Sequence, residues 1–120
     1  MAAKFTELVI DCADTERVAT FWARVLDYAV LDRDAGAVEI GAAHGVYPTL
    51  VFVPVPEGKT VKNRIHIDVN AVGTDQAGEL QRLLALGARQ VDVGQGEDVS
   101  WIVLADPEGN EFCLLRSTVT

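Results

Sequence analysis

The sequence predicts an α+β fold built from two tandem copies of one strand–helix–three-strand unit. In each half of the chain a strand pattern is followed by one amphipathic helix pattern and then by three short strand patterns. A break that contains Pro56 and Gly58 separates the halves. The 120 residues therefore divide into a module 1–57, a linker 58–61 and a module 62–120. Neither half could bury its sheet alone, so we expect the two halves to pack as one domain.

The first module begins with the strand pattern "LVIDCAD", which stops at Asp14, a favourable N-cap residue. Behind it, apolar residues recur at the spacing of one helix face: Val18, Phe21, Trp22, Val25 and Leu26. Three strand patterns follow, "YAVLD", "AVEIGA" and "TLVFVPV", with the turn "RDAG" and the loop "HGVYP" between them.

The second module repeats this order. "NRIHIDV" (63–69) is predicted as a strand, and a helix is predicted from Thr74 or Asp75 to Gly87, where a left-handed C-terminal cap suits glycine. The strand patterns "RQVDV", "VSWIVLA" and "EFCLLR" follow. Residues Asp106–Gly109 carry Asp, Pro and Gly at the positions that a type I turn favours.

Composition narrows the classes of partner. A formal charge of −8 argues against nucleic acid and against an anionic membrane surface. No export signal and no apolar run of membrane-spanning length is visible, so we expect a cytoplasmic protein with Cys12 and Cys113 as free thiols.

Alternation along three strands places chemistry-bearing side chains on one face of each. These residues are Glu7 and Asp11 in the first strand, Arg64, His66 and Asp68 in the fifth, and Glu111 and Cys113 in the last. If these faces curl toward each other, the seven side chains converge on a cleft.

Several segments together resemble the vicinal oxygen chelate superfamily, and within it the glyoxalase-like and bleomycin-resistance-like group. They are "TERVATFWARVLDY", "KNRIHIDV", "LLALGA" and "VLADPEGNEFCLL". The resemblance covers nearly the whole chain and implies a curved, mostly antiparallel sheet around a cavity, as in the glyoxalase/bleomycin resistance/dioxygenase fold. It also implies a homodimer and a small-molecule ligand.

The resemblance further implies a divalent ion held by residues of the first and last strands of each module. The matching positions here are Glu7, seven residues before Asp14, and His66. The last-strand position falls on Cys113, with Glu111 two residues earlier on the same face, and the fourth strand offers no ligand. We therefore expect Glu7, His66 and Glu111 to bind Fe, Mn, Ni or Zn, if an ion is bound at all.

Glu111 is also the predicted catalytic acid–base residue, because neighbouring carboxylates favour its protonated form and so suit a base near neutral pH. Four residues are predicted to contact substrate: Arg64, Asp68, Asp11 and Cys113. Arg64 would orient an anionic group, and Asp68 or Asp11 would supply a base. Cys113 would be a small buried side chain.

Two functions remain open from the sequence. One is a metal-dependent isomerase, lyase or dioxygenase that acts on a small substrate with adjacent oxygens. The other is a metal-free protein that binds or sequesters a small molecule such as an antibiotic. The fourth strand favours this function, because it has no side chain that could bind a metal.

Overall fold

A computed structural model of the chain describes residues 1–91 and 100–120. The chain divides into two compact units, Met1–Gly58 and Lys59–Thr120. Each unit has the strand–helix–three-strand order that the sequence predicts. Neither helix in the described ranges has the length and apolar character needed to cross a membrane.

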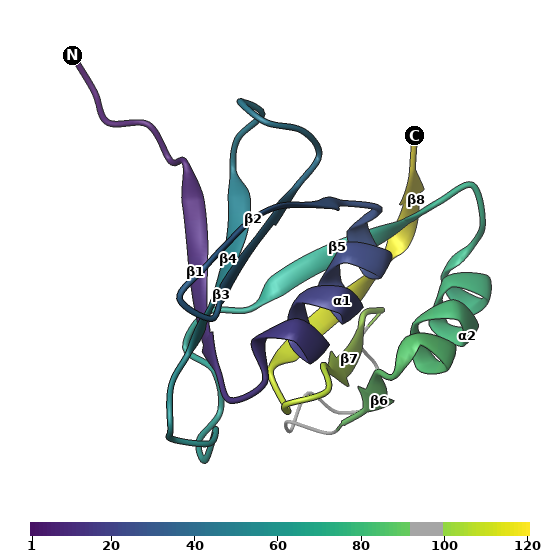
Figure 1. Cartoon of the computed structure of the whole chain (residues 1–120). Coiled ribbons are helices and arrows are strands. Elements are labelled where there is room, and N and C mark those ends of the chain that lie inside the picture. The colour runs from purple at the N-terminus through teal and green to yellow at the C-terminus, as the bar shows by residue number, and fades with distance from the viewer. Residues whose placement is uncertain (92–99) are drawn as a thin grey trace. The chain divides into compact units, whose positions relative to one another are not determined.

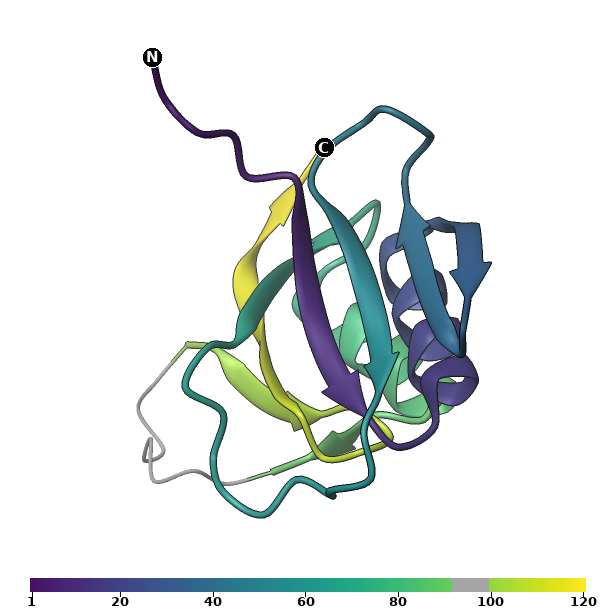
Figure 2. The same cartoon turned by 60° about the vertical axis from the view of Figure 1, so that its left-hand side comes forward.

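The first unit has a four-stranded mixed sheet covered by one helix (Figure 1). Its elements are β1 (Glu7–Cys12), α1 (Thr15–Leu26), β2 (Ala29–Asp34), β3 (Ala37–Gly41) and β4 (Thr49–Pro54). The spatial order is β1-β4-β3-β2, in which β1 and β4 are parallel and the other pairs are antiparallel. Figure 2 shows β1 and β4 side by side and pointing the same way.

Helix α1 begins where the sequence predicts, because the Asp14 carboxylate accepts a hydrogen bond from the Arg17 N–H at 3.1 Å. Its apolar stripe packs on β3 and β4. Phe21 and Trp22 are buried in this core with an edge-to-face ring arrangement, 5.5 Å between centroids.

The second unit repeats the design with β5 (Ile67–Val72), α2 (Gln76–Leu86), β6 (Arg89–Gln90), β7 (Ile102–Ala105) and β8 (Glu111–Val119). The sheet order is β5-β8-β7-β6, again with one parallel pair, β5 and β8. Two of the three pairings in each sheet are antiparallel, so the predicted α+β class and mostly antiparallel sheets are confirmed.

The predicted signals at the ends of α2 are confirmed. The Asp75 carboxylate accepts from the Gly78 N–H at 2.8 Å, and Gly87 ends the helix with φ of 117°. The turn before β8 is also confirmed, because the Gly109 N–H donates to the Asp106 carbonyl at 2.9 Å.

Several strand boundaries differ from the prediction. Strand β5 begins at Ile67 and not at Asn63, so Arg64 and His66 precede the strand. Strand β7 begins at Ile102, and β8 continues past Arg116 to Val119. The predicted strand "RQVDV" is seen as Arg89–Gln90, and its residues 92 and 93 lie outside the described ranges.

The reason for the late start of β5 lies in the hydrogen bonding. Strand pairing with β8 starts at Ile67 opposite Phe112. Before that point the Asn63 N–H donates to the side chain of Glu111 instead of to a neighbouring strand. Residues 64–66, between Asn63 and Ile67, therefore have an alternating sequence but form no ladder pairing with β8.

Candidate metal centre

One face of the second unit's sheet carries its chemistry-bearing side chains. Asp68 on β5 lies directly opposite Cys113 on β8, and Glu111 lies two residues earlier on β8. The other face, with Phe112 and Leu114 fully buried, packs against α2. The predicted division of β8 into an apolar face and a mixed face is therefore confirmed.

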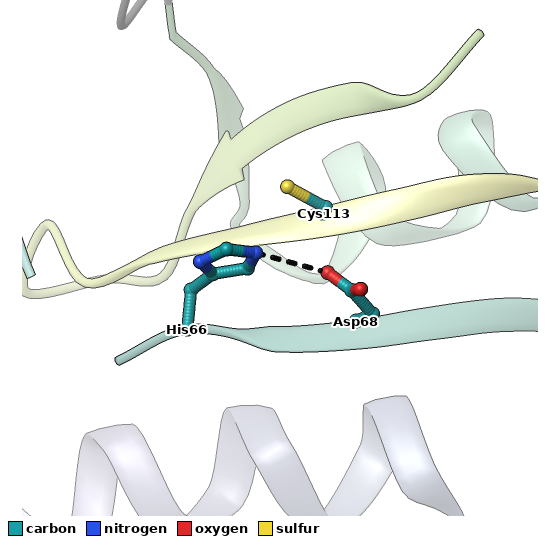
Figure 3. Close-up of side chains that lie close together, drawn as sticks. All are labelled: His66, Asp68 and Cys113. Carbon is teal, nitrogen blue, oxygen red and sulfur yellow. Dashed lines mark ion pairs between the residues drawn. The ribbon is translucent and has the colours of Figure 1, made fainter. Parts of the chain in front are cut away.

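Three side chains of this unit form a compact donor group: His66, Asp68 and Cys113 (Figure 3). Each offers one ligand atom, and these atoms all lie within 4.8 Å of one another. The His66 Nε2 atom lies 3.1 Å from Oδ1 of Asp68. The side chains of His66 and Asp68 are 45% and 48% exposed, and Cys113 is buried, so the group is open on one side.

The Cys113 thiol is protonated at neutral pH before any ion binds. Burial raises the pKa of Cys113, and the negative charge and hydrogen-bond acceptance of Asp68 raise it further, while the positive charge of Lys62 acts in the opposite direction. A cation that replaced the thiol proton would therefore meet a carboxylate already directed at the sulfur.

An imidazole nitrogen, a carboxylate oxygen and a thiolate sulfur suit a particular class of ion. Ligands of one Zn²⁺ lie at about 2.0–2.3 Å from it and hence at most about 4.6 Å from each other. The donor atoms of His66, Asp68 and Cys113, all within 4.8 Å of one another, lie close to this limit. A thiolate favours Zn²⁺, Co²⁺ or Ni²⁺ over Mn²⁺ or Mg²⁺, and three protein ligands leave a position for water or substrate.

Glu111, the other predicted ligand of this unit, is paired with cationic and N–H groups. Its Oε2 lies 2.7 Å from the Lys59 ammonium, and its Oε1 accepts from the Asn63 N–H at 3.1 Å. Burial raises the pKa of Glu111, but Lys59 and the backbone N–H groups of Asn63 and Glu111 outweigh burial, so the pKa is below its ordinary value. The raised pKa expected from the sequence is therefore wrong, and Glu111 is ionised at neutral pH.

The remaining predicted residue of this unit, Arg64, is exposed and lies two residues before His66. Lys62, close by in the sequence, is near enough to Cys113 to influence its thiol electrostatically. Positive charge thus lies beside the donor group in a chain that is acidic overall.

Glu7 and Asp11 lie exposed on β1 in the first unit, on the sheet face opposite α1. Glu7 is in register with Thr49 of β4, whose hydroxyl donates to Glu39 Oε2 at 2.7 Å. Glu39 of β3 therefore adds a carboxylate to the face where β4 has none. Glu39 was not predicted as a site residue, although the alternation in "AVEIG" places it on this face. The assignment of Glu7 as a ligand and Asp11 as a substrate contact stays a prediction.

The site predicted from the sequence and the donor group in the structure overlap in part. His66 is common to both. Asp68 and Cys113, predicted as substrate contacts, lie beside His66, and Glu111 pairs with Lys59. The missing signal was the register of β5 on β8, which single-strand patterns do not contain.

Comparison with known proteins agrees with the fold and the motifs. A family model described as "Glyoxalase-like domain" matches residues 7–115. No curated protein sequence matches the chain.

Several solved structures share the fold. A glyoxalase/bleomycin resistance/dioxygenase family enzyme from Burkholderia phytofirmans has a TM-score of 0.67 and 17% identity over 98% of this chain and 100% of that chain. The fosfomycin resistance protein FosX from Mesorhizobium loti has a TM-score of 0.71 and 15% identity over 99% of this chain and 96% of that chain.

A mutant FosX from Listeria monocytogenes, complexed with Mn(II) and 1S,2S-dihydroxypropylphosphonic acid, has a TM-score of 0.70 and 12% identity. That alignment covers 99% of this chain and 93% of that chain. At these identities the structural matches establish the fold, and the family model extends over most of the sequence. The chain therefore belongs to the glyoxalase-like domain family of the vicinal oxygen chelate superfamily.

Proposed function

We propose that this protein is a metal-dependent enzyme of the isomerase, lyase or dioxygenase type, and that His66, Asp68 and Cys113 bind its divalent ion. The observation that carries the proposal is the meeting of three different donor atoms within 4.8 Å on one sheet face. When bound, such an ion supplies Lewis-acid stabilisation of negative charge on a substrate oxygen.

The substrate class that fits is a small anion with two neighbouring oxygens. Arg64 is exposed beside His66 and provides a guanidinium for a carboxylate, phosphate or phosphonate group, with Lys62 adding positive charge. The FosX structure from Listeria contains a phosphonate with two hydroxyl groups, which supports the same class for this chain.

The predicted acid–base and ligand roles of residues outside the donor group belong to the same proposal. Glu7 is proposed as a metal ligand, and Asp11 as a substrate contact. Glu111 is ionised at neutral pH and hence can accept a proton, but its lowered pKa makes it a weak base.

Metal analysis of the untagged protein tests this function. We expect about one Zn²⁺ or Co²⁺ per chain, and at least a tenfold loss of affinity in His66→Ala, because removal of one of three ligands leaves an incomplete site. His44→Ala is the matched control, since His44 is the other histidine and is exposed between β3 and β4.

Loss of binding in His66→Ala alone supports the metal site. Sub-stoichiometric metal in the wild type after incubation with each ion, or equal affinity in the two variants, would overturn it.

A second function, binding of a small molecule without metal, has one observation in its favour. Strand β4 (Thr49–Pro54) carries neither a carboxylate nor an imidazole, so one ligand position implied by the family resemblance is not filled. Tight binding of an anionic ligand that is unaffected by chelators would favour this alternative.

A further inference from the structure

We infer that Glu111 is a positioning residue: it holds residues 59–66 beside β8 and so fixes His66 relative to Cys113. The inference rests on the proposed function in one respect, that His66 and Cys113 bind the same ion. It differs from the sequence-based assignment of Glu111 as a ligand.

The first observation is that one carboxylate contacts the segment at two points. Oε2 of Glu111 pairs with the Lys59 ammonium at 2.7 Å, and Oε1 accepts from the Asn63 N–H at 3.1 Å. Both contacts are shielded from water, since the side chains of Lys59 and Glu111 are only 21% and 10% exposed. Shielding strengthens a charge-assisted contact of this kind.

The second observation is that apolar burial contributes little to holding this segment. Val61 is 74% exposed and Ile65 is 72% exposed, and ladder pairing with β8 begins only at Ile67. A weaker contact, from the Asn63 side-chain amide to the Asn110 side-chain oxygen at 3.4 Å, also ends beside Glu111. The position of the segment therefore depends on polar contacts around Glu111.

The third observation is that Glu111 and Asn63, which are hydrogen-bonded to each other, are each close in sequence to one of the proposed metal ligands. Glu111 is two residues from Cys113 on the same face of β8, and Asn63 is three residues from His66. A carboxylate that ties Asn63 to β8 thus limits the distance between the imidazole and the thiol. Groups that orient a metal ligand without touching the ion commonly change affinity by about 10–100-fold when they are removed.

Lys59→Met separates the two roles of Glu111 by the direction of the effect on Co²⁺ affinity. If Glu111 binds the ion, removal of Lys59 frees the carboxylate and also removes a positive charge, so affinity rises. If Glu111 positions the segment, affinity falls by about tenfold despite the lost positive charge. Lys59→Arg, which keeps the charge and the pairing, should restore most of the affinity.

Lys62→Met is the matched control, because it removes the same charge from the same segment. Among the contacts seen in the described part of the chain, Glu111 has none with Lys62. Its Co²⁺ affinity should equal or exceed that of the wild type. An equal or higher affinity in Lys59→Met than in Lys62→Met would overturn the positioning role.

Hydrogen exchange of the metal-free protein tests the same inference without an ion. Amides of residues 60–66 should exchange faster in Lys59→Met than in Lys62→Met or the wild type, while the Phe112 amide on β8 keeps its protection and reports an intact fold. Unchanged exchange at 60–66 would refute the inference. A wild type that binds no metal would refute the proposed function. The hydrogen-exchange result would still decide whether Glu111 holds residues 59–66 beside β8.

Discussion

Cys113 acquires its candidate role from the residue across the strand pair and not from its own sequence neighbours. In the sequence it lies between Phe112 and Leu114, which is typical of a buried and unreactive cysteine. The structure confirms that it is buried and places Asp68 directly opposite. Because burial and Asp68 raise the pKa of the Cys113 thiol, the sulfur becomes a strong ligand only when a cation displaces its proton.

Glu111 shows the limit of residue-level prediction. Its position on the mixed face of β8 was predictable from alternation, and that prediction is confirmed. The direction of its pKa shift was not, because it depends on Lys59, 52 positions away in the sequence. A carboxylate with an ammonium partner and two N–H donors stays ionised, whatever the charges of its sequence neighbours.

The pair Glu16–Arg33 leads to a prediction about pH. A hydrogen bond from Arg33 lowers the pKa of Glu16, burial opposes this, and the charge of Arg33 adds to the lowering. A lowered pKa in the folded state means that the stabilisation is present above the unfolded-state value of about 4.3. It is lost as the pH falls through the folded-state pKa.

Urea unfolding of wild type, Glu16→Gln, Arg33→Gln and the double variant checks this prediction. The coupling free energy between the two residues should be small and favourable at pH 7, because the pair is exposed, and should be weaker at about pH 3, where Glu16 begins to be protonated. A coupling of the same size at both pH values would contradict the assignment.

At the scale of elements, helices were predicted more accurately than strands. Asp75 and Gly87 mark the ends of α2 because capping depends on residues within one turn of the end. The start of β5 depends on a partner strand that is distant in sequence, and so the alternation of "NRIHIDV" could not locate it. Ile65 is 72% exposed, so the apolar residue of this alternation that precedes Ile67 does not pack against a core.

The cap of α2 allows a direct test of its contribution to stability. Asp75→Ala removes the acceptor for the Gly78 N–H and should lower the free energy of unfolding by about 1 kcal/mol. Asp75→Ser, which keeps an acceptor, should lower it by less. Chemical denaturation measures both, and an alanine variant as stable as the serine variant would argue against the cap.

At the scale of the whole molecule, the chain uses one plan twice. Each unit has an aspartate-capped helix, a four-stranded sheet, and a parallel pairing between its first and last strands. This repetition was predictable, because it is written in the order of periodic segments. The predicted homodimer and the predicted role of Glu7 as a metal ligand stay predictions.

The two units differ in what their open sheet faces carry. The first unit places carboxylates there, including Glu7 and Glu39, and the second adds an imidazole and a thiol. With a net charge of −8 the protein attracts cations in general, but only the second unit offers donors of three chemical types within reach of one ion among the described residues. We therefore propose, as the central claim, that the second unit contains a metal site with a thiolate ligand.

The absorption spectrum of the Co²⁺-loaded protein tests that claim most directly. A Cys12→Ser variant, which keeps Cys113, should show a thiolate-to-cobalt charge-transfer band that saturates at one equivalent, and Cys113→Ser should lack it. A wild type with only the weak spectrum of hydrated Co²⁺, or a charge-transfer band that persists in Cys113→Ser, would contradict the account.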